Sequence, residues 1–217
     1  MAIERNPSAE PADAALIEGF RLAATAVISD NLLRLPGAVG LLPYHRVSGV
    51  MVGTAFTVRT RPGDNLALHE ALEQIHPGDV LVVDGGGDTS RALIGEIMMN
   101  IAIHRNAAGM VIDGAIRDVA AIAQMDLPCF ARGTTHRGPY KDGPGALNVP
   151  VSIGGMVVNP GDIVVGDEDG IVAFSQSIAP DLLQAVRAQE AREAEIIKSI
   201  QEGRYKGAYG KPSQAAE

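Results

Sequence analysis

The strongest constraint on the fold of this chain is the stretch 80–119, in which two short apolar runs flank a segment with helical spacing. The runs are Val80–Val83 and Met110–Ile112. Between them apolar side chains recur at steps of three and four, which predicts a helix with one face formed by Leu93, Ile97, Ile101 and His104. Fully apolar strands joined by a helix are typical of parallel pairing with burial on both faces. The sequence therefore predicts an α/β fold built around this strand–helix–strand unit.

Polar residues follow each of the two predicted strands directly. Asp84 precedes the run Gly85-Gly86-Gly87-Asp88, and Asp113 precedes Gly114-Ala115-Ile116-Arg117-Asp118. Ligands of parallel sheets tend to bind beyond the carboxyl ends of the strands. We therefore expect acidic groups, glycines and one arginine to converge in a site at this edge of the sheet.

Length and composition limit the classes of protein to consider. At 217 residues the chain can bury a sizeable core. Its formal net charge of −8 argues against nucleic acid or an anionic membrane as the main partner. The single cysteine, Cys129, excludes an internal disulfide and a clustered thiolate metal site. The first residues contain no long apolar stretch, so we expect no signal peptide, no membrane span and a cytoplasmic protein.

The remaining sequence predicts a single domain over residues 1–217, with a central sheet flanked by helices. We expect a loose arm over 1–13, helices over 14–21, 26–35 and 66–74, and a loop over 132–148 that contains His136. Pro180 suits the first position of a C-terminal helix over 180–203. At 1.5 Å per residue this helix would be roughly 30–35 Å long, enough to reach a neighbouring subunit. Residues 204–217 are predicted to form a disordered tail.

The pair Arg117-Asp118 has two interpretations. An aspartate at a strand–helix turn is often only an N-cap, and an arginine beside it is often a surface residue. Alternatively, Asp118 ligates Mg²⁺, which typically takes one or two carboxylates and keeps several waters, while Arg117 faces an anionic oxygen of a substrate. Glu96 lies near the start of the preceding helix on the same side, although it could simply interact favourably with the helix dipole.

The segment Gly95-Glu96-Ile97-Met98 also has two interpretations. If the helix begins near Gly95, its free backbone N–H groups form an anion site suited to a carboxylate. If the helix begins at Ser90, those groups are already hydrogen-bonded and the anion site does not exist. The sequence alone is compatible with both.

Several other kinds of site are disfavoured. The glycines after Asp84 do not fit G-x-G-x-x-G, and the phosphate-binding G-x-x-x-x-G-K-[ST] pattern does not occur, so nucleotide binding is not expected. The five histidines never occur at metal-ligand spacing, which disfavours zinc. No lysine lies at a buried strand end where a Schiff base could form, and no G-x-S-x-G elbow is present. Any carbon–carbon bond chemistry should therefore depend on a metal.

Longer stretches of the chain resemble a known family, over roughly Ala24 to Gly203. The sequence is similar to the RraA-like family, which contains 4-hydroxy-4-methyl-2-oxoglutarate/4-carboxy-4-hydroxy-2-oxoadipate aldolases and the regulator of ribonuclease E activity A. The similar stretches are PGDN at 62–65, HPGDVLVVDGGGD at 76–88, GE at 95–96, VIDGAIRDV at 111–119 and NVPVSIGGMVVNPGDIVVGDEDGIV at 148–172. The spacing from Glu96 to Arg117-Asp118 matches that of the aldolase members.

This resemblance implies a fold and a set of roles. The fold would be a swivelling β/β/α-type domain that assembles as a homotrimer or hexamer. Asp118 would ligate Mg²⁺ or Mn²⁺, Arg117 would contact the oxygen that becomes the enolate, and Glu96 would hold metal-bound water. The backbone of Gly95, Glu96, Ile97 and Met98 would receive the pyruvate carboxylate. Spacing back from the end of the C-terminal helix places Glu195 as the glutamate that a neighbouring subunit contributes near the metal waters.

The implied reaction is the metal-dependent cleavage of a 4-hydroxy-2-oxo acid to pyruvate and a second oxo acid, with oxaloacetate decarboxylation as a side activity. Many family members carry an acid three positions after the metal aspartate, whereas this chain has Ala121 there.

Two other functions compete with this lyase reaction. The chain could be a lyase or decarboxylase of another small oxo or sugar acid, or a non-catalytic regulator of ribonuclease E. Asp118 is typically missing in the regulator branch, which favours the enzyme. The methyltransferase label that the family often inherits is discounted because no nucleotide-type glycine loop is present.

Overall fold

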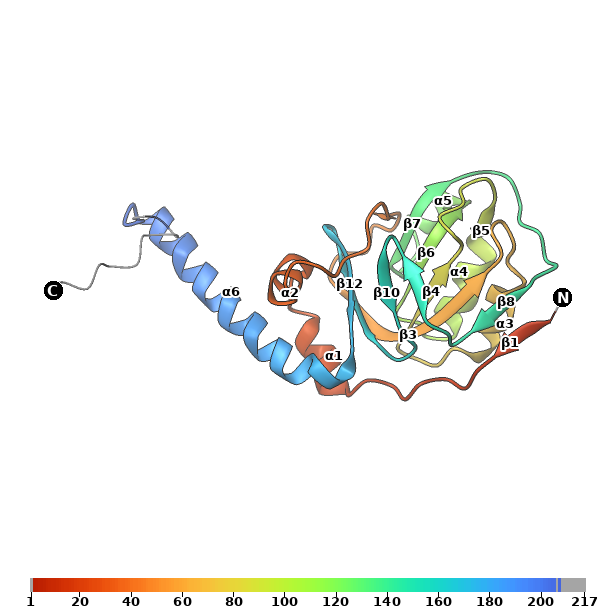
Figure 1. The fold of residues 1–217 in the computed structure, drawn as a ribbon. Helices are drawn as coiled ribbons and strands as arrows, with labels where there is room; N and C mark the ends of the chain where they lie inside the picture. Colours follow the sequence, from red (N-terminus) through yellow and green to blue (C-terminus); the bar gives the residue numbers. More distant parts are fainter. Residues whose placement is uncertain (1, 206, 208–217) are drawn as a thin grey trace.

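The structure is a computed structural model that describes residues 2–205 and 207 (Figure 1). The α/β class with a central sheet, flanking helices and a long C-terminal helix is confirmed. Within the described part of the chain, ten strands belong to one sheet, with the continuous order β1-β8-β3-β4-β6-β7-β2. β11 and β12 extend this sheet from β3, β5 pairs with β6, and β9 and β10 form a separate two-stranded ribbon. The strand bounds are β1 Ile3–Arg5, β2 Leu42–Pro43, β3 Met51–Thr60, β4 Asp79–Asp84, β5 Ala92–Ile94, β6 Gly109–Ile116, β7 Cys129–Thr134, β8 Gly145–Leu147, β9 Val151–Ile153, β10 Met156–Val158, β11 Ile163–Asp167 and β12 Gly170–Phe174.

The expected parallel pairing of the two apolar strands is confirmed. β4 pairs with β6 in parallel, with Asp84 opposite Asp113 in register. Successive side chains of a strand point to opposite faces. Leu81 and Val83 accordingly pack into the core beneath the helices, whereas Val80 and Val82 pack into the core beneath the β9–β10 ribbon. Both faces of β4 are therefore buried, as a fully apolar strand requires.

Helices cover one face of the sheet and strands cover the other. The helix bounds are α1 Ala14–Phe20, α2 Thr25–Asn31, α3 Leu66–Gln74, α4 Glu96–His104, α5 Val119–Ile122, a 3₁₀ turn η1 Gln176–Ile178 and α6 Ala179–Gln201. α3, α4 and α5 contribute Leu68, Met99 and Ile122 to the core on the helical face. A third cluster joins α1, α2 and the start of α6 to β11 and β12.

The C-terminal helix leaves the body of the protein after its second turn. Its buried side chains are Ala179, Leu182, Leu183 and Val186. Beyond Val186 the helix projects away from the sheet (Figure 1), and Ile197 and Ile200 are 54% and 52% exposed. No helix in the described part of the chain is long and apolar enough to cross a membrane. The predicted tail over 204–217 lies mostly outside the described residues.

The N-terminal segment is not a loose arm. β1 adds in parallel to the edge of β8, and Ile3 is buried. The N–H of Ala12 donates to Thr54 Oγ1 at 2.9 Å, and the Asp13 carboxylate caps α1. This segment is polar and interrupted by prolines, so its sequence did not predict these contacts. A three-residue edge strand is too short to show a periodic pattern of apolar residues.

Two further predictions on local structure were wrong. Leu93 lies in β5 and not in the helix, and the expected buried face is exposed, since Ile97 is 74% and Ile101 36% accessible. The side chains of α4 that pack inward are Met98, Met99 and Ala102. A segment that is apolar on nearly every side has no unique face by spacing alone. The expected loop over 132–148 begins as the end of β7 and contains β8, which completes the sheet beside β3.

The face that α4 presents to the core can be tested at Met99, which is fully buried. Met99→Ala should lower the free energy of unfolding by about 2–5 kcal/mol through lost burial and a residual cavity. Met99→Leu, which keeps the side-chain volume, should cost less than about 1.5 kcal/mol. Urea unfolding of both variants measures these values. An alanine variant as stable as the wild type would mean that another face of α4 packs inward.

Candidate functional site

The N-terminus of α4 is the first element of the candidate site. The helix begins at Glu96 with Gly95 as its N-cap, because the preceding residues pair as β5 with the end of β6. The N–H of Arg117 donates to Ile94 O at 3.0 Å, which holds β5 in the extended conformation up to the cap. The interpretation in which the helix starts near Gly95 is therefore correct, and the Ser90 start is excluded.

Asp118 lies across this helix end. It follows β6 in a left-handed conformation, with φ of 59°, and its side chain makes no capping hydrogen bond to α5. Instead, Oδ2 accepts the backbone N–H of Glu96 at 3.0 Å. A side chain on Gly95 would overlap Asp118 Oδ2 and crowd Arg117. The glycine at the cap thus allows the Asp118 carboxylate to approach the helix end, and the simple N-cap interpretation of Asp118 does not hold for α5.

Arg117 and Asp118 remain accessible to solvent. Arg117 Nε lies 3.6 Å from Asp118 Oδ2, and both side chains are 43% exposed. An exposed ion pair of this kind contributes little to stability, about 0–1 kcal/mol. Stability therefore does not explain why the two charges are held at this place.

The helix end can accept a second anion. No described residue accepts a hydrogen bond from the backbone N–H of Ile97 or Met98, and such groups at a helix N-terminus attract anions. A carboxylate bound there would lie close to the carboxylate of Asp118. Two carboxylates at such short range repel one another unless a cation lies between them. The arrangement is therefore suited to an acidic ligand bound together with a positive charge.

The residues present fit a magnesium-like ion and not a protein-enclosed metal. No group of three histidine, cysteine or acidic side chains that could hold a metal occurs among the described residues. Mg²⁺ usually binds to one or two carboxylates and completes its shell with waters and substrate oxygens. No described residue donates to Asp118 Oδ1, so this oxygen is available as a ligand. Zinc, which prefers three or four protein ligands, is not supported by this donor set.

A cavity of about 170 Å³ begins at this pair and extends toward α3. It is smaller than the roughly 300–1,000 Å³ of pockets for drug-sized ligands, which indicates a small molecule. Besides Gly95, Arg117 and Asp118, its wall includes Asn65, His69 and Lys141. Asn65 is buried, and its Nδ2 donates to Leu93 O at 2.9 Å. Its Oδ1 accepts no hydrogen bond from the described residues.

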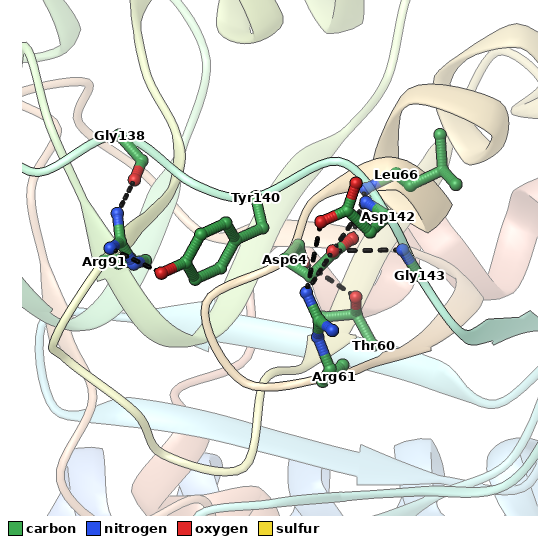
Figure 2. A network of polar contacts seen from close by, with 9 residues as sticks. All are labelled: Thr60, Arg61, Asp64, Leu66, Arg91, Gly138, Tyr140, Asp142 and Gly143. Atoms are coloured by element: carbon green, nitrogen blue, oxygen red, sulfur yellow. Dashed lines mark hydrogen bonds and ion pairs between the residues drawn. The ribbon is translucent and has the colours of Figure 1, made fainter. Parts of the chain in front are cut away.

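Part of the cavity wall belongs to the segment 138–143, which Figure 2 shows fastened to the turn before α3. The Asp64 side chain is fully buried and accepts backbone N–H groups of Leu66, Asp142 and Gly143. Arg61 lies 3.0 Å from the same carboxylate. Burial raises the pKa of Asp64, but these donors and the Arg61 charge outweigh burial, so the net pKa lies below the usual value.

Tyr140 fixes the other half of this segment. The guanidinium of Arg91 stacks 4.0 Å from the centre of its ring and donates to its hydroxyl at 2.8 Å (Figure 2). Arg91 also donates to Gly138 O. The backbone of Tyr140 is paired with Gly63 and Asn65. A segment without regular secondary structure is thus held rigidly against α3.

Three further predicted residues lie outside the wall of the small cavity. Glu96 is exposed in the first turn of α4, and its N–H contacts Asp118. His136 lines a second hollow of about 350 Å³ that is also lined by Arg117 and Asp118. Glu195 lies on the projecting part of α6, far from α4 and β5 within one chain (Figure 1), where it pairs with Arg204 at 3.6 Å.

The expected convergence of all strand-end acids was wrong. Asp84 and Asp113 point to the face covered by the β9–β10 ribbon, where they accept the N–H groups of Ser152 and Gly154. Asp113 also accepts a hydrogen bond from Arg132 Nε. These residues line a separate open hollow of about 620 Å³. Arg117 and Asp118 follow the end of β6, and the contact of Asp118 with the Glu96 N–H places them beside the start of α4 instead. Cys129 is buried, which raises its thiol pKa to about 12 and excludes it as a nucleophile.

Comparison with known proteins places the chain in a family. The RraA-like family, described as Aldolase/RraA, matches residues 25–173. A relative from Halalkalibacterium halodurans named "Putative 4-hydroxy-4-methyl-2-oxoglutarate aldolase" is 38% identical over 188 residues, covering 85% of this chain and 90% of that protein. The chain belongs to the RraA-like family.

Solved structures agree with this assignment. RraAS2 of Streptomyces coelicolor, described as an unusual member of the RNase ES inhibitor RraA protein family, has a TM-score of 0.79 and 29% identity, covering 86% of this chain and 97% of that one. A Geobacillus kaustophilus structure named as S-adenosylmethionine:2-dimethylmenaquinone methyltransferase has a TM-score of 0.64 and 37% identity, covering 69% of this chain and 93% of that one.

Because Asp64 holds segment 138–143 in place, the free energy of unfolding should depend on pH. Because the folded pKa of Asp64 lies below the unfolded value of 3.8, its contribution to stability is fully present above about pH 4 and is lost as the pH falls through the folded pKa. Asp64→Asn should therefore be less stable than the wild type at about pH 7, by an amount that shrinks at lower pH. Urea unfolding across this range, with Asp126→Asn as an exposed control, measures the difference. A difference independent of pH would contradict the assignment.

Proposed function

We propose that this protein is a divalent-metal-dependent lyase that cleaves a 4-hydroxy-2-oxo acid of the 4-hydroxy-4-methyl-2-oxoglutarate type to pyruvate and a second oxo acid. The observation that carries the proposal is the position of Asp118 on the N-terminus of α4, beside Arg117 and two free backbone N–H groups. Family membership and the name of the Halalkalibacterium relative support a lyase over other uses of such a site.

The chain's own groups can bind and orient the reacting half of the substrate. The N–H groups of Ile97 and Met98 would receive the C1 carboxylate, and the Arg117 guanidinium would donate to the C2 oxygen. Asp118 and the water held by Glu96 would retain Mg²⁺ or Mn²⁺, which when bound supplies Lewis-acid charge to the 2-oxo group. Breaking the C3–C4 bond leaves its electron pair on C3 as the enolate of pyruvate, and the C4 hydroxyl loses its proton as a carbonyl forms there. Arg117 would then stabilise the charge that the enolate oxygen gains.

The same site would also decarboxylate oxaloacetate. Loss of carbon dioxide from that substrate produces the same pyruvate enolate, so the groups that stabilise one reaction stabilise the other. A site for a C1 carboxylate and a 2-oxo group does not by itself identify the group beyond C4. Another small oxo acid or sugar acid is therefore the alternative substrate.

We also propose that the active form is a homotrimer or a hexamer. The site of one chain is open on the side of Arg117 and Asp118, which are 43% exposed. The projecting part of α6 carries exposed Ile197 and Ile200, which no core formed by the described residues covers. Packing this helix against a neighbouring subunit would bury the isoleucines and bring Glu195 toward that subunit's metal.

Pyruvate release tests the proposed reaction. Oxaloacetate and 4-hydroxy-4-methyl-2-oxoglutarate are supplied with Mg²⁺ and then with excess chelator. We expect metal-dependent pyruvate from both, and Asp118→Ala should abolish turnover while thermal unfolding stays near the wild-type midpoint. Asp126→Ala, which removes an exposed carboxylate outside the site, serves as the matched control and should retain activity.

The outcomes separate the competing functions. Pyruvate from oxaloacetate alone would preserve the site but assign another natural substrate. Full activity in Asp118→Ala would remove the metal proposal. Absence of pyruvate from both substrates, in wild type and variants alike, would favour the non-catalytic regulator.

Glu195 provides a second test. If it acts from a neighbouring subunit, Glu195→Ala should reduce kcat by less than Asp118→Ala does, because it would contact the metal through water and not directly. Glu190→Ala, on the same helix, is the control. Light scattering should show a trimer or hexamer for the wild type, for Glu195→Ala and for Glu190→Ala. An active monomer would rule out a role of Glu195 between subunits.

A further inference from the structure

We propose that the open hollow beside the turn of the β9–β10 ribbon is a second binding site, whose ligand is a small neutral polyhydroxy compound such as a monosaccharide or a sugar alcohol. This ribbon hollow is defined by Asp84, Asp113, Arg132, Ser152 and the turn Gly154-Gly155. Its volume of about 620 Å³ lies within the roughly 300–1,000 Å³ of small-molecule sites. It shares no lining residue with the cavity at the start of α4, so the inference does not rest on the proposed lyase reaction.

The three charged residues of the ribbon hollow come from the second halves of adjacent parallel strands. Asp84 ends β4 and lies opposite Asp113 of β6 in register. Arg132 belongs to β7, where the preceding Ala131 pairs with Ile112 of β6. Neighbouring strands are about 4.8 Å apart, so the three backbones lie within roughly 10 Å of one another. Ligands of parallel sheets bind beyond the carboxyl ends of the strands, and the ribbon hollow lies at this edge.

The Asp84 carboxylate is held in a fixed orientation and can still accept hydrogen bonds from a ligand. Its Oδ1 accepts the N–H of Gly86 at 3.0 Å, and its Oδ2 accepts the N–H of Ser152 at 3.3 Å. An ionised carboxylate has about four lone-pair sites, so these two bonds leave others available. Asp84 is only half-buried, and the hollow gives access to it. A group that is oriented before the ligand arrives loses little entropy when the ligand binds.

Arg132 presents hydrogen-bond donors to the same hollow. Its Nε donates to the buried Asp113 carboxylate, which fixes the guanidinium plane. Among the described residues, its terminal nitrogens have a single hydrogen-bond partner, Val39 O at 3.5 Å from Nη2. A side chain at Gly40 would overlap Nη1, and one at Gly87 would crowd Nε. These two glycines leave the guanidinium accessible, and 29% of the Arg132 side chain is exposed.

The walls of the ribbon hollow do not suit an apolar ligand. Among the described residues that line it there is no aromatic side chain, and the one large aliphatic side chain, Val39, is 75% exposed. Pockets for apolar ligands are lined mainly by hydrophobic and aromatic side chains. The ligand of this hollow is therefore recognised by hydrogen bonds.

The charges of the hollow favour a neutral ligand. Two acidic side chains and one basic side chain give it a net negative charge, which disfavours an anion, whereas a cation attracted to Asp84 would be repelled by Arg132. A hydroxyl group can donate to the Asp84 carboxylate, which only accepts, and a second hydroxyl can accept from the guanidinium, which only donates. Adjacent hydroxyl groups on a short carbon skeleton therefore satisfy both side chains without adding charge. The Ser152 hydroxyl, which can donate or accept, lines the same hollow.

The test measures binding of neutral and charged probes by saturation-transfer NMR, in buffer without divalent metal. D-Mannitol and D-ribose are the neutral polyols, and succinate and methylammonium are the charged comparators. We expect saturable binding of the polyols with a Kd on the order of 1–10 mM, as for a ligand held by a few hydrogen bonds. Succinate and methylammonium should bind at least about 10-fold more weakly.

Variants assign the binding to the ribbon hollow. Ser152→Tyr fills the hollow from an exposed strand position and should weaken polyol binding about 10-fold or more. Gln184→Tyr, at an exposed position of α6 outside the hollow, is the control for added bulk and should bind like the wild type. Asp84→Asn, whose fold is checked by thermal unfolding, should weaken binding about 10-fold through loss of a charge-assisted hydrogen bond.

Two kinds of result would overturn the proposal. Absence of saturable polyol binding, or equal binding by Ser152→Tyr and the wild type, would exclude the ribbon hollow as the site. Saturable binding of succinate or methylammonium without binding of either polyol would show that the assigned class of ligand is wrong. None of these results depends on whether the protein releases pyruvate from any substrate.

Discussion

The parallel pair of β4 and β6 is buried on both faces, and this burial determines where polar groups can lie. Burying a charge without a partner is costly, and the buried acids of both strands have partners. Asp79, at the start of β4, accepts the N–H of His76, and Asp113, within β6, binds Arg132 and the N–H of Gly154. The pleat then sends alternate side chains to opposite sides. Asp84 and Asp113 face the β9–β10 ribbon and bind its backbone. β6 continues for three residues before Arg117 and Asp118 emerge at the helical face, which leaves these two charges available for a ligand.

This geometry explains which features the sequence could predict. The alternation-free apolar runs correctly indicated parallel, doubly buried strands, and Pro180 correctly marked the start of the C-terminal helix. The segment 90–104 was ambiguous because β5 is three residues long and α4 is apolar on most sides. Only the pairing of β5 with β6 shows that Leu93 is extended and that the helix starts at Glu96. The contact of Arg132 with Asp113 joins residues of two different strands, and no local pattern encodes it.

The charges around the helix end would change when an acidic ligand binds. Asp118 already neutralises part of the positive end of α4 through the Glu96 N–H. Arg117 contributes one positive charge, and a bound substrate carboxylate would contribute another negative one. The proposed divalent cation would offset this added negative charge, since it would attract both carboxylates and let them share one helix terminus. The one-carboxylate donor set then favours an ion that depends on the substrate for its remaining ligands, which would couple metal affinity to substrate binding.

The candidate site has one wall that is fixed by hydrogen bonds within the chain and one side that is open. The segment 138–143 has no helix or strand, yet its backbone is bonded to buried Asp64 and its tyrosine is held by Arg91. Such a loop loses its conformational entropy when the protein folds. Ligand binding therefore does not have to order it. The part of α6 beyond Val186, by contrast, has no core to pack on among the described residues of its own chain. One wall of the candidate site is thus completed within the chain, whereas the side toward Asp118 would be completed by the proposed oligomer. In that arrangement the activity would be linked to the oligomeric state.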